Sequence, residues 1–401
     1  MSELGDKFLR HVAQTSDSPL GLEIARAEGS WLCATDGRRY LDLIAGIGVS
    51  ALGHGNPHVL AAIEHQMRRH LHVMVYGEYV IEKQARLADR LAEVLPRPLD
   101  RIYFTNSGAE AIEGSLKAAR KLTRRSGFVA FDGAYHGDTM GAMALAGNPA
   151  FREPFGALPG PVRHIPYNDI ASLEAIDDTI AAVVVEPVQA EGGVRIPGRE
   201  FIAALRELCD RSGALLIFDE VLTGFGRTGK LFALEHYGVV PDVIVLAKAL
   251  GGGLPLGAFA ARDEIMNVLA HDPPLGHITT FGGHPLSCAA GLASLDVILA
   301  ERLWERAQAI GDRFRQRIES LGSEQIAAVR GIGLLIGIEM RSAAMAARFV
   351  AESVARGVII NWTLNADTVV RLAPPLTITP EEIDFALDAM NAALQAGSRT
   401  R

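Results

Sequence analysis

Two patterns of apolar positions alternate along the chain from about residue 58 onward. Helical stretches, in which apolar residues recur every three or four positions, alternate with short runs of β-branched and aromatic residues. Alternation of this kind is typical of crossover units and predicts an α/β fold, in which helices flank a mostly parallel central sheet. Strands are predicted over residues 101–104, 127–131, 181–185, 214–218, 243–246 and 257–261.

The N-terminal segment follows a different pattern. Residues 31–34 and 40–43 are apolar runs that flank a turn at Asp36 and Gly37, and they predict a β-hairpin. This hairpin belongs to an arm rather than to a domain of its own.

The C-terminal segment predicts a second, smaller unit. A long helical stretch runs from Pro285 to residue 321, residues 331–340 read as one strand, and Thr379 followed by two acids marks the start of a last helix. We therefore predict an N-terminal arm with part of the small domain over residues 1–55, a large domain over 56–294 and a smaller α+β domain over 295–401.

Composition narrows the class of protein. With 401 residues, of which 49% are hydrophobic and 21% charged, the chain is long enough for two globular domains, and its net charge of -8 argues against a nucleic-acid partner. Three cysteines without CxxC spacing predict neither a disulfide framework nor a zinc ribbon. The first residues lack a signal-peptide pattern, and no stretch approaches the ~20 apolar residues that span a bilayer, so we expect a cytoplasmic protein with no membrane contact.

Lys248 is the most informative single residue. It follows the apolar run 243–246 and precedes the glycines at 251–253. Burial at the carboxyl end of a strand favours the neutral amine, which attacks carbonyl carbons, so this position predicts a Schiff-base lysine. Taken alone, a lysine that snorkels to water from the end of a strand is the more common explanation.

A second candidate site is the turn at Ser107, Gly108 and Ala109, between a predicted strand and a predicted helix. Free backbone N–H groups and a serine hydroxyl at a helix start form a seat for a phosphate. An ordinary helix cap explains this segment equally well when it is considered alone.

Acidic and aromatic side chains follow other predicted strands. Asp219 ends one strand, where open α/β sheets place ligands, and could pair with a protonated ring nitrogen or serve only the structure. Tyr135 and His136 bring an aromatic face to the same edge, although a core tyrosine is common. Glu186 and Glu191 add carboxylates there, and either could simply be solvated.

Two motif matches fail on their context. Gly224, Gly226 and Gly229 match GxGxxG, and Lys230 nearly completes a P-loop, but Leu231 occupies the position that would hold magnesium. We therefore expect no nucleotide site there. We also expect no metal site, because the chain's histidines have no zinc-binding spacing.

In combination, these residues resemble the class III pyridoxal-phosphate aminotransferases, and most of all the acetylornithine and ornithine aminotransferase group. The resemblance runs from about Trp31 to the C-terminus. Its motifs are Asp36-Gly37 with Leu41-Asp42, Gly53-His54 before Pro57, Asn106 to Glu110, Tyr135 to Gly137, Glu186 to Gln189, Asp219 to Val221, Lys248 with its glycines, Thr279 to Gly283, and Arg371 to Pro375.

The resemblance implies a fold, a cofactor and roles for particular residues. The fold is pyridoxal-phosphate fold type I, and the cofactor is pyridoxal 5'-phosphate. Lys248 would bind the cofactor covalently and move the proton, and Asp219 would face the pyridinium. The other implied cofactor contacts come from Ser107, Gly108, Ala109, Tyr135, His136, Glu186, Val221 and, across a homodimer interface, Thr280.

Two further residues are implied to bind the substrate. Arg371 resembles the arginine that grips a substrate carboxylate, and Glu191 resembles the glutamate that pairs with it during one half-reaction. The implied reaction is a ping-pong transfer of an amino group, from a donor with a terminal, non-α amine to 2-oxoglutarate or pyruvate.

Three positions depart from the acetylornithine and ornithine pattern. Those enzymes usually carry an arginine, which holds a second carboxylate, where this chain has Asp138, and an acid would repel that group. Leu222 replaces a glutamine that bonds the phenolic oxygen of the cofactor, and Ile47 replaces a tyrosine that touches substrate. The run from Tyr135 to Thr139 looks instead like that of diaminopelargonate synthase and several ω-amine transaminases.

Alternative functions stay open at this point. An aminomutase or a racemase of the same fold would use the same residues without net transfer to an oxo acid, and a diaminopelargonate-type transaminase would differ only in substrates. A cofactor-binding regulator is a third class, disfavoured by the reactive lysine.

Overall fold

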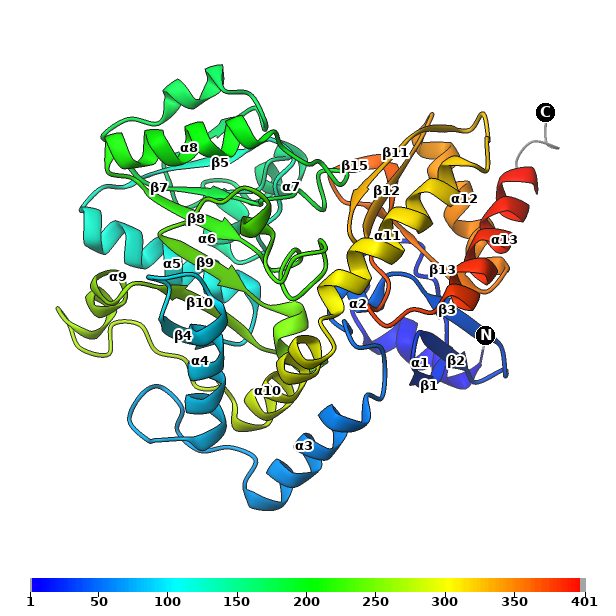
Figure 1. Ribbon diagram of the computed structural model, residues 1–401, viewed down its shortest axis with the longest axis horizontal. Coiled ribbons are helices and arrows are strands. Elements are labelled where there is room, and N and C mark those ends of the chain that lie inside the picture. The colour runs from blue at the N-terminus through cyan, green and yellow to red at the C-terminus, as the bar shows by residue number, and fades with distance from the viewer. Residues whose placement is uncertain (1, 397–401) are drawn as a thin grey trace.

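The apolar runs of the large domain form one sheet. The computed structural model describes residues 2–396 and is shown in Figure 1. All six predicted strands are present, and a seventh was not predicted. They are β4 (Arg101–Thr105), β5 (Gly127–Phe131), β6 (Val162–Ile165), β7 (Ile180–Val185), β8 (Leu215–Asp219), β9 (Val243–Leu246) and β10 (Gly257–Ala261).

This sheet has the order β4-β10-β9-β8-β7-β5-β6. Strands β6, β5, β7, β8 and β9 pair in parallel, whereas β10 is antiparallel to both of its neighbours. The prediction of a mostly parallel sheet is therefore confirmed. Strand β6 lacks a continuous apolar run, because it is an edge strand on which Arg163 is exposed and His164 is half-buried.

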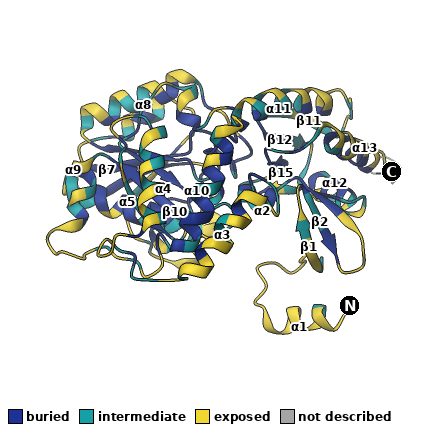
Figure 2. Cartoon of the chain, turned by 60° about the horizontal axis from the view of Figure 1, so that its bottom comes forward, coloured by how far each residue is buried: buried dark blue, intermediate teal, exposed yellow. Residues whose placement is uncertain are grey.

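Helices cover both faces of this sheet. Val183 of β7 packs in one core cluster and its neighbour Val184 in the other, as expected when successive side chains of a strand point to opposite faces. Helix α5 (Gly108–Thr123) contributes Ile112 to the second cluster, and α8 (Arg199–Ser212) contributes Phe201 to the first. Figure 2 shows the buried strands between these helices.

The remaining strands form two four-stranded sheets. One joins β1 (Ile24–Glu28), β2 (Trp31–Ala34) and β3 (Arg39–Asp42) to β13 (Val358–Ile359), so the predicted hairpin is confirmed and lies beside a strand from the other end of the chain. The other joins β11 (Ile326–Ile332), β12 (Leu335–Met340), β15 (Ala366–Leu372) and β14 (Asn361–Thr363).

The single strand predicted over residues 331–340 was wrong. Gly333 adopts φ +56°, and the chain turns there to give the separate strands β11 and β12. The N–H of Leu334 donates to the carbonyl of Arg227 at 2.9 Å, which removes that residue from the ladder.

The other helices connect these sheets. They are α1 (Glu3–His11), α2 (Ala45–Gly48), α3 (Pro57–Arg69), α4 (Glu82–Val94), α6 (Met140–Ala144), α7 (Pro149–Arg152), α9 (Asp263–Asn267), α10 (Pro285–Ala300), α11 (Leu303–Glu319), α12 (Ala343–Ala355) and α13 (Pro380–Ala396). The final helix begins next to Thr379 as predicted. Residue 295 lies inside α10, and the proposed domain boundaries stay a prediction.

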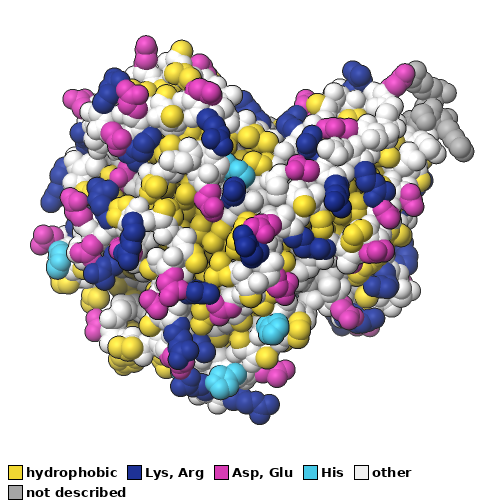
Figure 3. All heavy atoms as spheres, in the orientation of Figure 1, with side chains coloured by type: hydrophobic (Ala, Val, Ile, Leu, Met, Phe, Trp, Pro, Cys, Tyr) yellow, Lys and Arg dark blue, Asp and Glu magenta, His cyan; other side chains and the backbone are white. Residues whose placement is uncertain are grey.

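The surface between the two lobes of Figure 1 is chemically mixed. Figure 3 shows apolar side chains gathered toward the middle of this face, with charges of both signs around them. Within residues 2–396, no helix has both the length and the apolar character that a membrane span requires.

Candidate active site

A cavity of about 520 Å³ lies at the carboxyl ends of the parallel strands. Its walls come from the segments that follow β4, β5, β7, β8 and β9, which is the edge where open α/β sheets bind ligands. Ten of the predicted residues line it, namely Ser107, Gly108, Ala109, Tyr135, His136, Glu186, Glu191, Asp219, Val221 and Lys248. The fold therefore brings together side chains that are far apart in the sequence.

The start of helix α5 forms one wall. Ser107 caps the helix, because its hydroxyl accepts from the N–H of Glu110 at 3.2 Å. The N–H groups of Gly108 and Ala109 have no partner within the helix and form its positive end. A Cβ on Gly108 would lie 2.9 Å from Val221, so only glycine allows this approach of the backbone to Val221.

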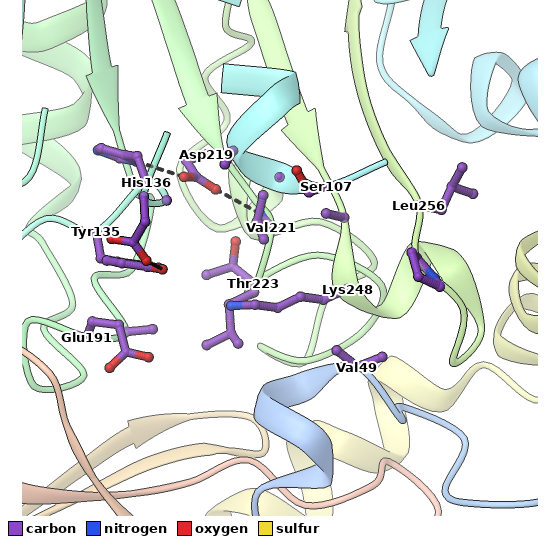
Figure 4. Close-up of a pocket in the computed structure, with 18 of the residues that line it drawn as sticks. Val49, Ser107, Tyr135, His136, Glu191, Asp219, Val221, Thr223, Lys248 and Leu256 are labelled. Atoms are coloured by element: carbon purple, nitrogen blue, oxygen red, sulfur yellow. Dashed lines mark hydrogen bonds and ion pairs between the residues drawn. The ribbon is translucent and has the colours of Figure 1, made fainter. Parts of the chain in front are cut away.

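The loop after β5 closes against this helix start. Gly137 has φ +119°, and a Cβ there would lie 2.4 Å from the Cβ of Ala109. The fixed loop presents the ring of Tyr135 to the cavity, opposite Val221, as Figure 4 shows. Burial and the bond from its hydroxyl to Asp138 raise the pKa of Tyr135, so the phenol stays protonated.

Asp219 is held by two donors at the floor of the cavity. Nδ1 of His136 lies 2.7 Å from one carboxylate oxygen, and the N–H of Val221 donates to the other at 3.0 Å (Figure 4). Burial alone would lower the pKa of His136, but the hydrogen bond and charge of Asp219 outweigh burial and raise it. The pair thus keeps a carboxylate oriented toward a buried site.

Glu186 is a second buried acid beside Asp219. It accepts from the N–H groups of Tyr135 at 3.2 Å and Ala190 at 3.1 Å. Burial, assisted by the charge of Asp219, raises the pKa of Glu186 to about 7 despite these bonds. Its position fixes the loop of Tyr135 rather than offering a free carboxylate.

Lys248 is partly buried and faces the cavity with an amine that no described residue bonds. It follows β9 and adopts φ +50°, a strained conformation for a lysine. Burial, followed by the charge of Arg371, lowers the pKa of Lys248 to about 8, although nearby acids oppose this shift. An appreciable fraction of the amine is therefore neutral near physiological pH and is able to attack a carbonyl carbon.

The predicted substrate pair lies at the edge of the cavity. Arg371 of β15 is 1% exposed and forms an ion pair with Glu191, which also accepts from the N–H of Leu364 at 2.9 Å. Burial would raise the pKa of Glu191, but Arg371 outweighs burial and lowers it. Arg371 itself is not among the residues that line the cavity, whereas its partner Glu191 is.

Thr280 lies apart from these residues. It is exposed, and it is not among the residues that line the cavity. Its predicted contact with a neighbouring subunit stays a prediction.

The three departures occupy distinct places. Asp138 lines the cavity, is exposed to solvent and accepts from the Tyr135 hydroxyl at 2.7 Å. Leu222 packs in an apolar cluster with Val188, and a Cβ on Gly48 would lie 2.8 Å from it. Ile47 packs against the same cluster instead of lining the cavity.

Several lining residues were not predicted. Val49 directly follows α2, whose residues 45–48 have positive φ angles, and no sequence signal places it here. Thr223 follows the acidic strand end, and the segment from Gly253 to Leu256 follows the lysine. The glycines after Lys248 are the one signal that pointed to this second segment.

The donor set fits a flat heteroaromatic ring with a phosphate arm. Free N–H groups and a serine hydroxyl suit the phosphate, Asp219 suits a protonated ring nitrogen, and the amine of Lys248 suits an aldehyde on the ring. Tyr135 and Val221 provide the two flat walls (Figure 4). This is the chemistry of pyridoxal phosphate.

Comparisons with known proteins agree with this chemistry. The family model described as "Aminotransferase class-III" matches residues 12–394. The chain is 44% identical over 395 residues to the acetylornithine aminotransferase of Methanopyrus kandleri, with 98% of each chain covered. It is 43% identical over 373 residues to the putrescine aminotransferase of Pectobacterium atrosepticum, which covers 89% of this chain and 79% of that protein.

A solved structure matches the whole fold. The ornithine aminotransferase of Toxoplasma gondii, crystallised with partial occupancy of PLP at its active site, has a TM-score of 0.91 and 31% identity. The match covers 99% of this chain and 94% of that one.

Proposed function

The chain belongs to the class III aminotransferases, which use pyridoxal phosphate, and from this premise we propose that it transfers a terminal, non-α amino group to an oxo acid such as 2-oxoglutarate or pyruvate. The observation that carries this proposal is the unpartnered amine of Lys248 in a cavity that also holds Asp219 and the start of α5. Relatives named for acetylornithine and putrescine support a donor with a terminal amine.

Residues of this chain would hold the cofactor. The N–H groups at the start of α5 and the Ser107 hydroxyl would bind its phosphate, and Asp219 would keep its ring nitrogen protonated. When bound, pyridoxal phosphate supplies an electron sink for negative charge at the substrate carbon that loses a proton. Tyr135 and Val221 would orient the ring so that this carbon faces Lys248.

Lys248 would act as the acid–base group. Its amine would remove the proton from the substrate carbon and return a proton to the cofactor carbon, a role that needs a pKa near the working pH. The lowered pKa of about 8 supports this role. The dry wall formed by Leu222 and Val49 would exclude water from the proton transfer.

The pair of Arg371 and Glu191 would let one cavity accept two substrates. While the pair is closed, Glu191 covers the guanidinium and the cavity accepts a donor that lacks an α-carboxylate. When an oxo acid enters, its carboxylate would replace Glu191 on Arg371 as a bidentate partner. The burial of Arg371 supports this gate, because a buried guanidinium requires an anionic partner in both half-reactions.

We further propose a cytoplasmic homodimer with shared sites. Thr280 lies between Ile278 and Phe281, which are 50% and 54% exposed, and Val80 on a neighbouring loop is 97% exposed. The rings of His72 and Phe281 lie 4.9 Å apart, so these two segments form one apolar surface suited to a second copy. Buried, unpaired cysteines at 33, 209 and 288 support a reducing compartment.

The function is tested by labelling and by turnover. The cofactor-loaded protein is reduced with borohydride, digested and analysed by mass spectrometry, and the label is expected on Lys248. Lys248→Ala is expected to lose the label and to lower transamination by roughly a thousandfold or more. The exposed Lys230→Ala is the matched control, with label and turnover unchanged.

The same assay separates transamination from its alternatives. With a nitrogen-15 amine and 2-oxoglutarate, labelled glutamate should accumulate in proportion to the carbonyl product. Isomerised or racemised donor without labelled amino acid would contradict the proposal and favour an aminomutase or a racemase.

A further inference from the structure

One carboxylate of the cavity lacks a compensating partner. Asp219, Glu186 and Glu191 each accept from backbone N–H groups, and two of them also pair with a histidine or an arginine. Asp138 accepts only the Tyr135 hydroxyl at 2.7 Å, on one oxygen. Within residues 2–396 its other oxygen has no hydrogen-bond or ion-pair partner, and the side chain is exposed at the cavity.

The position of Asp138 is well determined by its surroundings. Gly137 fits against Ala109 so closely that the loop has no room to shift toward α5. The N–H of Tyr135 is bonded to Glu186, and its hydroxyl is bonded to Asp138. Figure 4 shows the amine end of Lys248 pointing across the cavity toward the side on which Tyr135 lies. Asp138 lines the same cavity and is bonded to the Tyr135 hydroxyl, so a donor whose amine reacts beside Lys248 shares the cavity with this carboxylate.

No cation balances this acid. Among the described lining residues, Lys248 is the only lysine or arginine, and its amine is reserved for the reaction. Arg371 does not line the cavity, and its guanidinium is paired with Glu191. A substrate carboxylate placed near Asp138 would meet a like charge with no cation to offset it, whereas an ammonium would gain a charge-assisted hydrogen bond.

We propose that Asp138 binds the distal ammonium of a short aliphatic diamine, so that the amino donor of this enzyme is a diamine rather than an amino acid. This inference rests on the proposed function and names the donor for the same cavity. The Tyr135 hydroxyl donates to one oxygen of Asp138, and the other oxygen, which has no partner among residues 2–396, would accept from the ammonium. Because the paired Arg371 is not needed for such a donor, the closed gate is the state that accepts it.

The reaction balances without a further reagent. The diamine carbon that carries the reacting amine loses two electrons and its nitrogen, and it becomes an aldehyde. The oxo carbon of the acceptor gains the same two electrons and the nitrogen, so the acceptor becomes an amino acid. The carbonyl oxygen of the acceptor leaves as water, and a water molecule supplies the oxygen of the aldehyde. The distal ammonium leaves unchanged in an aminoaldehyde.

The test compares putrescine with butylamine, which has the same carbon chain but no second amine. The first half-reaction of the holoenzyme is followed by the loss of the visible band of the lysine-bound cofactor. The wild-type kcat/KM for putrescine should exceed that for butylamine by roughly tenfold or more. Asp138→Asn should lower this ratio by about tenfold. Asp132→Asn, an exposed acid in the same loop, is the matched control and should leave the ratio unchanged.

Two further measurements keep the proposal falsifiable. Tyr135→Phe removes the hydroxyl but keeps the carboxylate of Asp138. Both donors should react more slowly in this variant, but its ratio of kcat/KM for putrescine to that for butylamine should stay above the ratio of Asp138→Asn. γ-Aminobutyrate places a carboxylate where putrescine has an ammonium. Asp138→Asn should therefore raise the kcat/KM for γ-aminobutyrate relative to that for putrescine.

A wild-type ratio near one, or an equal loss for both amines in Asp138→Asn, would overturn the assignment of Asp138. If butylamine converts the cofactor as efficiently as putrescine, the assignment of Asp138 and the diamine donor both fail, whereas the proposed aminotransferase function stands. If no amine converts it, the proposed aminotransferase function fails as well.

Discussion

At the scale of single residues, the cavity depends on buried charges that are each held by a specific partner. Arg371 is the clearest case, because its guanidinium is 1% exposed and Glu191 is its only ion-pair partner within residues 2–396. Removing one partner of a buried pair leaves the other charge unpaired in a medium of low dielectric. Substitutions here should therefore change which carboxylates enter the site.

We predict that Glu191→Ala raises the rate of the side reaction in which glutamate donates its α-amino group. Without Glu191, Arg371 is free to hold the α-carboxylate of glutamate, and we expect about a tenfold gain in kcat/KM. Single-turnover kinetics with glutamate as the donor measures this gain in rate. Glu191→Gln is the matched variant, because it keeps the size of the side chain but removes its charge, and it should show a smaller gain. A rate equal to the wild type in both variants would remove the gate from the mechanism.

At the scale of elements, the site depends on how closely the β5 loop and the start of α5 fit. Both have a glycine at the contact point, Gly137 in the loop and Gly108 in the first turn of the helix. The relative positions of Ser107, Ala109 and Tyr135, and therefore the cofactor contacts proposed for them, depend on this junction. A small displacement of either element would separate the phosphate seat from the ring wall.

Gly137→Ala is therefore expected to weaken pyridoxal phosphate binding by roughly tenfold or more, because the new Cβ would lie 2.4 Å from the Cβ of Ala109. Titration of the apoprotein, followed by absorbance, measures the dissociation constant. Gly37→Ala is the control, since Gly37 has φ +86° but nothing within 4 Å of the added atom, so it tests backbone strain alone. Equal affinities for Gly137→Ala and the wild type would show that the junction tolerates displacement.

A second junction joins the large sheet to the C-terminal strands. Arg227, in the glycine-rich segment that resembles a nucleotide motif, is 2% exposed and donates to the carbonyls of Leu334 and Pro374. Burial lowers the pKa of Arg227 to about 9, and the charge of Arg371 adds to this effect. The segment thus positions β12 and β15, and with them Arg371, against the cavity. Its glycines serve close packing, because a Cβ on Gly229 would lie 3.0 Å from the Cβ of Gln308.

At the scale of the whole molecule, the proposed shared site takes Thr280 from a second subunit. Thr280 lies outside the cavity of its own chain, in a segment with exposed apolar neighbours. A homodimer would bury these side chains and bring Thr280 to the other phosphate seat. Dimerisation and cofactor affinity should therefore change together.

Phe281→Asp is predicted to shift the protein toward monomer and to weaken pyridoxal phosphate binding, because a charge in an apolar interface is left without a partner. Analytical ultracentrifugation and cofactor titration measure the two effects. Phe155→Asp changes an aromatic side chain that is 58% exposed, and it should alter neither. A Phe281→Asp dimer of wild-type stability would contradict the interface, and a monomer with unchanged cofactor affinity would contradict the shared site.

The sequence by itself determined the large sheet and the chemical character of its edge. Continuous apolar runs such as residues 181–185 specify a strand because both faces are buried, and the residues that follow parallel strands must meet at one edge. The sequence therefore predicts that Ser107, Tyr135, Asp219 and Lys248 lie at one edge of the sheet, and the structure places all four in one cavity. The family resemblance added Arg371 and Glu191, and the structure places them in contact.

Only the tertiary structure decided which of these groups are neutralised and which are not. His136 pairs with Asp219 across 83 positions of sequence, and Glu186 bonds the backbone of Tyr135 across 51. The end of β11, the edge strand β6 and the entry of Val49 into the cavity also depend on neighbours far along the chain. The local sequence pattern gives the period and polarity of one segment. Whether a charged side chain has a partner depends instead on the distances between segments that are far apart in the sequence. For that reason the uncompensated carboxylate of Asp138, and the diamine donor that it implies, could be identified only in the folded chain.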